Sequence, residues 1–142
     1  MKGARWSALA AALFFASAPA AVAAAKESAR ALLGAGVAAF TQVRFDAAEE
    51  KLSAALVMRP SWRTASGFRA LVLWTNGDMK RARAEAARAA RMKAGSAETF
   101  AARGYARMIL GRHQAAAADF VKSARADPRY LPAYLGMGSV RS

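Results

Sequence analysis

Small and apolar residues recur along this chain with a period of 34 positions. Counted from Ala29, small residues occupy the eighth position (Gly36, Ala70, Gly104, Gly138), the twentieth (Ala48, Ala82, Ala116) and the twenty-seventh (Ala55, Ala89, Ser123). A polar break divides each stretch near its middle, at 42–44, 76–78 and 111–113. Because small residues let two helix backbones approach closely and a polar break lets the chain reverse, each stretch predicts a helical hairpin.

The hairpin pattern predicts six helices and a shorter terminal one. The expected ranges are 29–42, 46–59, 63–75, 79–93, 97–110 and 114–126, followed by a helical segment within 131–142. Asp46, Asp78 and Ser96 are candidate N-caps, and Pro60 is a stop signal. No stretch alternates β-branched and polar residues with period two, so the predicted class is all-α.

These residues resemble the tetratricopeptide repeat family. The family pattern asks for a large apolar residue at the fourth position, an aromatic near the seventeenth, small ones at the eighth, twentieth and twenty-seventh, and proline at the thirty-second. The residues that match outside the small positions are Leu32, Phe45, Pro60, Phe100, Phe120 and Pro128. The array covers 29–62, 63–96 and 97–130. The chain departs from the family at the seventh and eleventh positions, where Arg69, Arg103 and Arg107 stand.

The resemblance implies a right-handed α-solenoid of three hairpins that binds proteins and has no catalytic role. Segment 131–142 begins like a fourth first helix and stops before a partner. It is interpreted either as a helix that caps the stack or as the start of a further repeat in a longer protein.

Residues 1–25 have the order of a secretory signal. Lys2 and Arg5 precede an uncharged run, and two small-x-small cleavage sites lie at 21–23 and 23–25. Two alternatives stay open, namely an uncleaved membrane anchor and a cytoplasmic helix. A signal or an anchor predicts an exported, periplasmic repeat domain of bacterial type.

The composition limits the kinds of catalytic and metal site that the chain could form. The absence of cysteine excludes disulfides, thiolate catalysis and Cys-based metal sites. His113 is the only histidine, Glu49 and Glu50 are adjacent rather than facing, and no phosphate loop or metal-binding motif occurs. We therefore predict a protein that is not an enzyme and uses no cofactor or metal.

The formal net charge of +13 predicts attraction to anions. The predicted second helix of the middle repeat concentrates basic residues, four of which fall within about one quadrant at 100° per residue. These are Lys80, Arg81, Arg88 and Arg91. They form either a solvated outer face or a dock for an anionic envelope component such as glycan, lipid or an acidic partner. Export disfavours nucleic acid as the partner.

The resemblance also implies a concave groove lined by the first helix of each hairpin. The expected groove residues are Leu33, Val37, Phe40, Phe68, Leu71, Trp74, Tyr105, Met108 and Ile109. The alternative is that several of them belong to the hairpin core. Family members that grip a C-terminal carboxylate use polar residues at positions that here hold Leu33, Val37, Phe68, Glu98 and Ala102, so that clamp is not expected. The resulting hypothesis is an exported scaffold that binds a protein or peptide through an apolar groove, with Trp74 as the main anchor.

Overall fold

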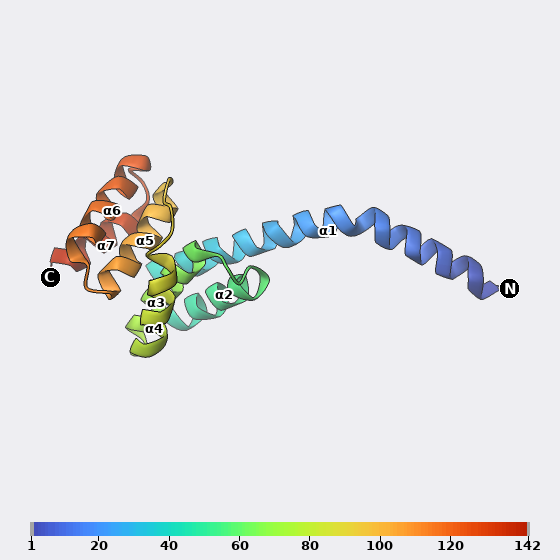
Figure 1. Cartoon of the computed structure of the whole chain (residues 1–142), viewed down its shortest axis with the longest axis horizontal. Coiled ribbons are helices and arrows are strands. Elements are labelled where there is room, and N and C mark those ends of the chain that lie inside the picture. Colours follow the sequence, from blue (N-terminus) through green and yellow to red (C-terminus); the bar gives the residue numbers. More distant parts are fainter. Residues whose placement is uncertain (1, 142) are drawn as a thin grey trace.

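Seven α-helices make up the chain in its computed structural model, which describes the backbone of residues 2–141 and the side chains of residues 18–141 (Figure 1). Their bounds are α1 Lys2–Thr41, α2 Phe45–Met58, α3 Arg63–Thr75, α4 Met79–Ala89, α5 Ala97–Ile109, α6 His113–Ala126 and α7 Leu131–Arg141. No strand occurs within the described backbone, and the all-α prediction is confirmed.

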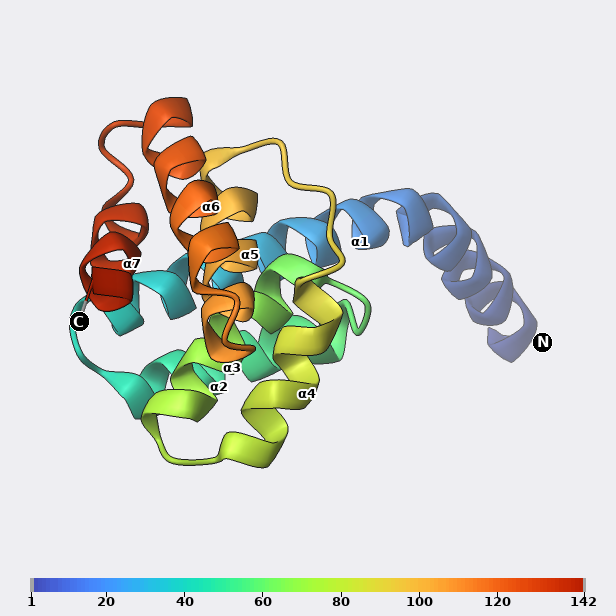
Figure 2. The same cartoon turned by 60° about the vertical axis from the view of Figure 1, so that its left-hand side comes forward.

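Consecutive helices pair as three hairpins, and the hairpins stack. The closest packing joins α1 with α2, α3 with α4 and α5 with α6, while α3 against α5 makes the main contact between hairpins. Helix α7 packs on α6 and α5 at the end of the stack (Figure 2). One hairpin cannot bury its apolar face alone, so the stack is what supplies a continuous core.

The small residue at the eighth repeat position makes room for a large one on the partner helix. A Cβ on Gly36 would lie 2.7 Å from Leu52 Cγ, and a Cβ on Gly104 would lie 2.7 Å from Phe120 Cε1. Both distances are shorter than van der Waals contact. In the middle hairpin the eighth position holds Ala70, which is larger than glycine and fully buried. The facing position on the partner helix holds Ala86, which is smaller than Leu52 or Phe120. The volumes of the two positions are therefore complementary within each hairpin.

Each hairpin reverses at a residue with positive φ. The residues are Val43 (60°), Gly77 (86°) and Gly111 (77°), which share one repeat position. Glycine adopts this conformation without steric cost, whereas a β-branched residue does not. The first turn is therefore strained in a way that the other two are not.

Two of the three expected N-caps are confirmed. The Asp78 carboxylate accepts from the backbone N–H of Arg81, and Ser96 and Thr99 form a reciprocal capping box at the start of α5. The prediction for Asp46 was wrong. Helix α2 begins at Phe45 without a side-chain cap, so Asp46 lies inside its first turn, where it still complements the helix dipole.

Helix α4 ends at Ala89, four residues before the predicted end at Lys93. The physical reason lies at Met92. Its carbonyl oxygen turns to accept a hydrogen bond from Arg103 at 3.0 Å, and its side chain is buried. These contacts across to the next hairpin replace the last turn of the predicted helix.

The N-terminal half of α1 extends away from the hairpins (Figure 1). Every side chain from 18 to 28 is exposed, and Ala29 is the first buried residue described. Most of the predicted signal segment 1–25 lies outside the described side chains. Within the part of the chain that is described, no helix combines the length and hydropathy needed to span a membrane.

Candidate functional site

The nine expected groove residues divide by burial into two groups. Leu33, Val37, Phe68, Leu71, Tyr105 and Ile109 are buried in the hydrophobic core, and Phe40, Trp74 and Met108 are partly buried against it. Five of the first six are closed off in the core, which corrects that part of the prediction and supports the core alternative, whereas Ile109 also borders a pocket. The last three share the twelfth repeat position.

Tyr105 closes the expected groove. Its ring centroid lies 6.2 Å from Phe40 on α1, 6.1 Å from Phe68 on α3 and 4.9 Å from Phe120 on α6. Its hydroxyl donates to the backbone oxygen of Pro132 on α7 at 2.5 Å. Burial raises the pKa of Tyr105 well above its usual value, so the phenol stays a neutral donor. The tyrosine thus contacts residues of four other helices at this place.

A pocket of about 420 Å³ remains where the second and third hairpins meet. Its lining residues are Trp74, Arg83, Met108, Ile109, Leu110, Gly111 and His113. It therefore brings together three of the predicted groove residues, from the ends of α3 and α5. Phe40 is not part of it, because its ring packs on Phe45 and Tyr105. The rim adds Arg83 and the exposed His113, which the groove prediction did not include.

All four residues of the predicted basic patch are exposed, and their surroundings differ. Arg81 lies 3.3 Å from the Asp78 carboxylate and 3.8 Å from that of Glu49, so acidic neighbours offset its charge. Arg88 and Arg91 lie at the other end of α4 and line a separate pocket. Lys80 is exposed near the helix start and lines neither pocket.

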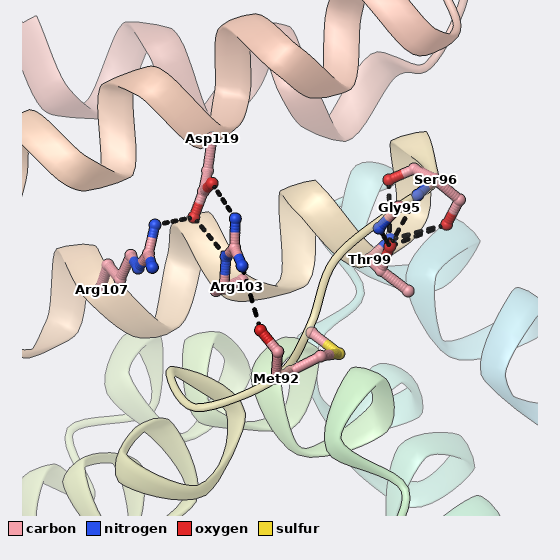
Figure 3. A network of polar contacts seen from close by, with 7 residues as sticks. All are labelled: Met92, Gly95, Ser96, Thr99, Arg103, Arg107 and Asp119. Atoms are coloured by element: carbon pink, nitrogen blue, oxygen red, sulfur yellow. Dashed lines mark hydrogen bonds and ion pairs between the residues drawn. The ribbon is translucent and has the colours of Figure 1, made fainter.

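The strongest polar network lies inside the third hairpin and was not predicted (Figure 3). Asp119 on α6 is fully buried. Arg103 donates to both of its oxygens, at 3.0 and 2.8 Å, and Arg107 donates to one at 2.8 Å. The remaining Arg103 amino group reaches the Met92 carbonyl. Such a paired, hydrogen-bonded charge is what burial of a carboxylate requires.

The second hairpin carries the same pair one repeat earlier. Arg69 and Glu85 lie 34 positions before Arg103 and Asp119. Their single contact is 3.4 Å long, and Arg69 Nε and Glu85 Oε2 are buried without a hydrogen-bond partner among the described residues. The sequence held a signal for both pairs, namely an acidic residue 16 positions after each arginine at the seventh repeat position.

Two further titratable groups cluster where α5 begins. Burial raises the pKa of Glu98, and the Arg30 guanidinium, 3.9 Å away, opposes that rise. Burial also raises the pKa of Tyr130, and the negative charge of the Glu98 carboxylate raises it further. Among the described residues no group of His, Asp and Glu side chains is placed to hold a metal ion.

The fold is that of an all-α repeat protein, and its candidate binding sites are pockets on the surface of the stacked hairpins. The sequence model of the tetratricopeptide repeat family matches residues 7–63, 44–97 and 69–130. The chain belongs to the tetratricopeptide repeat family. Domains of this family are generally non-catalytic scaffolds for protein–protein interaction.

Solved structures with a similar fold are tetratricopeptide domains. The Arabidopsis OM64 domain is 22% identical, with 81% of this chain and 95% of that chain covered and a TM-score of 0.47. The Aspergillus fumigatus Sgt2 domain is 18% identical, with 80% and 76% covered and a TM-score of 0.49. The first domain of Spaghetti (RPAP3), solved with an HSP90 peptide, is 18% identical, with 81% and 91% covered and a TM-score of 0.48. No curated protein sequence matches this chain.

Proposed function

We propose that this chain is an exported scaffold that binds a short protein segment in the pocket between its second and third hairpins. The observation that carries the proposal is the meeting of Trp74 with Met108 and Ile109 around a cavity of about 420 Å³. Partly exposed aromatic and methionine side chains beside a cavity are the groups enriched at binding hot spots.

The rim of the pocket indicates which segment would fit. Arg83 and His113 flank the apolar floor, and no acidic residue lines the pocket. A segment that inserts one apolar side chain and carries an acidic residue beside it would complement both features. The pocket is distinct from the closed groove. The clamp positions hold four apolar residues and the acidic Glu98, which gives no support to recognition of a C-terminal carboxylate.

The export part of the proposal rests on residues 1–25, which have the order of a secretory signal. The packing supports it, because side chains 18–28 are exposed and the described core begins at Ala29. Cleavage after 23 or 25 would remove none of that core. Intact mass of the protein from its native host should lack about 23 to 25 residues. A full-length cytoplasmic species would contradict export without bearing on the pocket.

The pocket is tested with Trp74→Ala, and Trp62→Ala serves as the control. Both tryptophans are partly buried, but Trp62 stacks under Arg59 at 4.1 Å, away from the pocket. Loss of an anchor at a hot spot costs about 2 kcal/mol or more of affinity. Proteins retained from envelope extract at high salt by the wild type should therefore be lost from Trp74→Ala and kept by Trp62→Ala. Equal retention by both variants, at matched folded fraction, would contradict the proposal.

A further inference from the structure

A second pocket, of about 400 Å³, lies between the α2–α3 connection and the second hairpin. Its lining residues are Pro60, Ser61, Arg63, Ser66, Arg88 and Arg91. Pro60 and Ser61 belong to the α2–α3 connection, Arg63 and Ser66 to the first turn of α3, and the other two arginines to the end of α4 and the turn after it. Three arginines therefore line one cavity, one from α3, one from the end of α4 and one from the turn after it.

The positive charge of this pocket is largely uncompensated. Within the described chain neither Arg63 nor Arg91 makes an ion pair, and Arg63 Nη1 instead donates to the Arg91 carbonyl at 3.4 Å. Arg88 lies 4.0 Å from Glu85, whose nearer partner is Arg69 at 3.4 Å. No acidic residue lines the cavity.

Neutral donors at the same place add to this charge. Helix α3 starts without a side-chain cap, so the N–H groups of its first turn and the positive end of its dipole are left for an acceptor. Ser66 is only 2% exposed and lines the pocket, and its hydroxyl makes no hydrogen bond within the described residues. Its oxygen is not sealed from solvent, so the hydroxyl is free to donate to a ligand in the cavity.

We propose that this pocket binds a phosphate group. A guanidinium fork matches the oxygens of phosphate. Guanidinium groups that arrive from two helices suit a tetrahedral dianion with several oxygens better than a flat carboxylate. The lining has no aromatic side chain on which a nucleobase could stack, so the ligand is inorganic phosphate or the phosphate group of a lipid or glycan rather than a nucleotide. The site is separate from the pocket at Trp74 and does not depend on its function.

Calorimetric titration of the full chain with inorganic phosphate at low ionic strength tests the proposal. We expect saturable binding with one site per chain that chloride at equal ionic strength does not reproduce. The variant Arg63→Gln/Arg88→Gln/Arg91→Gln should lose it. Lys80→Gln/Arg125→Gln/Arg129→Gln removes the same charge from exposed positions outside the pocket and should retain it. Equal loss in both variants, or no saturable binding by the wild type, would overturn the proposal.

Ser66→Ala gives an independent readout. Because the hydroxyl has no partner in the protein, its removal should leave the unfolding midpoint unchanged while weakening phosphate binding about tenfold, the effect of one hydrogen bond to a charged group. Unchanged affinity in Ser66→Ala would contradict the geometry of the site. Vesicles that contain phosphatidic acid then identify the source. If the chain binds these vesicles through the three arginines and inorganic phosphate displaces it from them, the ligand is lipid phosphate. If the chain binds inorganic phosphate but not the vesicles, the ligand is the free ion.

Discussion

The second and third hairpins place the same ion pair at the same repeat positions, yet the two pairs differ in quality. In the third, both Asp119 oxygens are engaged by two arginines at 2.8 to 3.0 Å. In the second, one contact of 3.4 Å joins Arg69 to Glu85. The first hairpin has Ala35 and Lys51 at these positions and no such pair.

The difference comes from what surrounds each pair. Arg107 supplies a second guanidinium to Asp119, and the matching residue of the second hairpin is Leu73. The Met92 carbonyl accepts a hydrogen bond from the remaining amino group of Arg103. A shared motif in a repeat protein therefore fixes where a charge is buried, while the neighbouring residues decide whether its hydrogen bonds are complete.

The largest predicted effect separates these two pairs. Asp119→Asn should destabilise the protein by about 3 to 5 kcal/mol, because two partly buried guanidinium groups lose their fully buried counter-charge. Glu85→Gln should cost only about 1 kcal/mol, since its pair makes one long contact. Urea unfolding followed by circular dichroism measures both. Similar losses would mean that the geometric difference has no energetic consequence.

A second prediction concerns the contact between the two hairpins. A Cβ on Gly67 would lie 2.5 Å from the backbone oxygen of Ala102. Gly67→Ala should therefore push α3 away from α5 and lower the free energy of unfolding by about 1 to 3 kcal/mol. Gly34→Ala is the matched control. It lies in α1 with no atom within 4 Å of the added Cβ, and should stabilise the helix by about 0.5 to 1 kcal/mol. Thermal unfolding should thus shift in opposite directions, and a shift of the same sign would refute the close approach.

The smallest predicted effect extends the comparison to the first hairpin. Val43 has φ of 60° and is 70% exposed, whereas its counterparts in the other hairpins are glycines. Val43→Gly should relieve the backbone strain, while the extra conformational entropy that glycine gives the unfolded chain offsets part of that gain. The expected net stabilisation is about 0.5 kcal/mol. Chemical unfolding detects this shift. Destabilisation would mean that packing by the valine outweighs its backbone strain.

Much of the fold could be predicted because it depends on local pattern. The bounds of α3, Arg63–Thr75, were predicted to the residue, and Asp78 and Ser96 cap the helices assigned to them. The end of α4 could not be predicted, because it is set by the contact between Met92 and Arg103 on the next hairpin. Local propensity carries no information about such a partner.

The candidate site was predicted only in part for the same reason. Repeat register placed Trp74 and Met108 in equivalent positions, and the structure brings them to one pocket. Register alone could not show that Tyr105 would close the groove, since that depends on the rings that surround it and on the hydrogen bond to Pro132 in α7. The arginines at the seventh position were unexplained until the acidic partners on α6 and α4 were placed opposite them.

The segment between α4 and α5 has a mechanical consequence. It is fastened at Met92 by Arg103 and by the Thr64 hydroxyl, 3.5 Å from the Met92 sulfur, and at its far end by the Ser96–Thr99 capping box. A hinge at this connection would have to break the hydrogen bond between Arg103 and the Met92 carbonyl, so we expect the second and third hairpins to move together. A ligand in the Trp74 pocket, which spans both hairpins, would then leave the joint with the first hairpin as the place where the stack can bend.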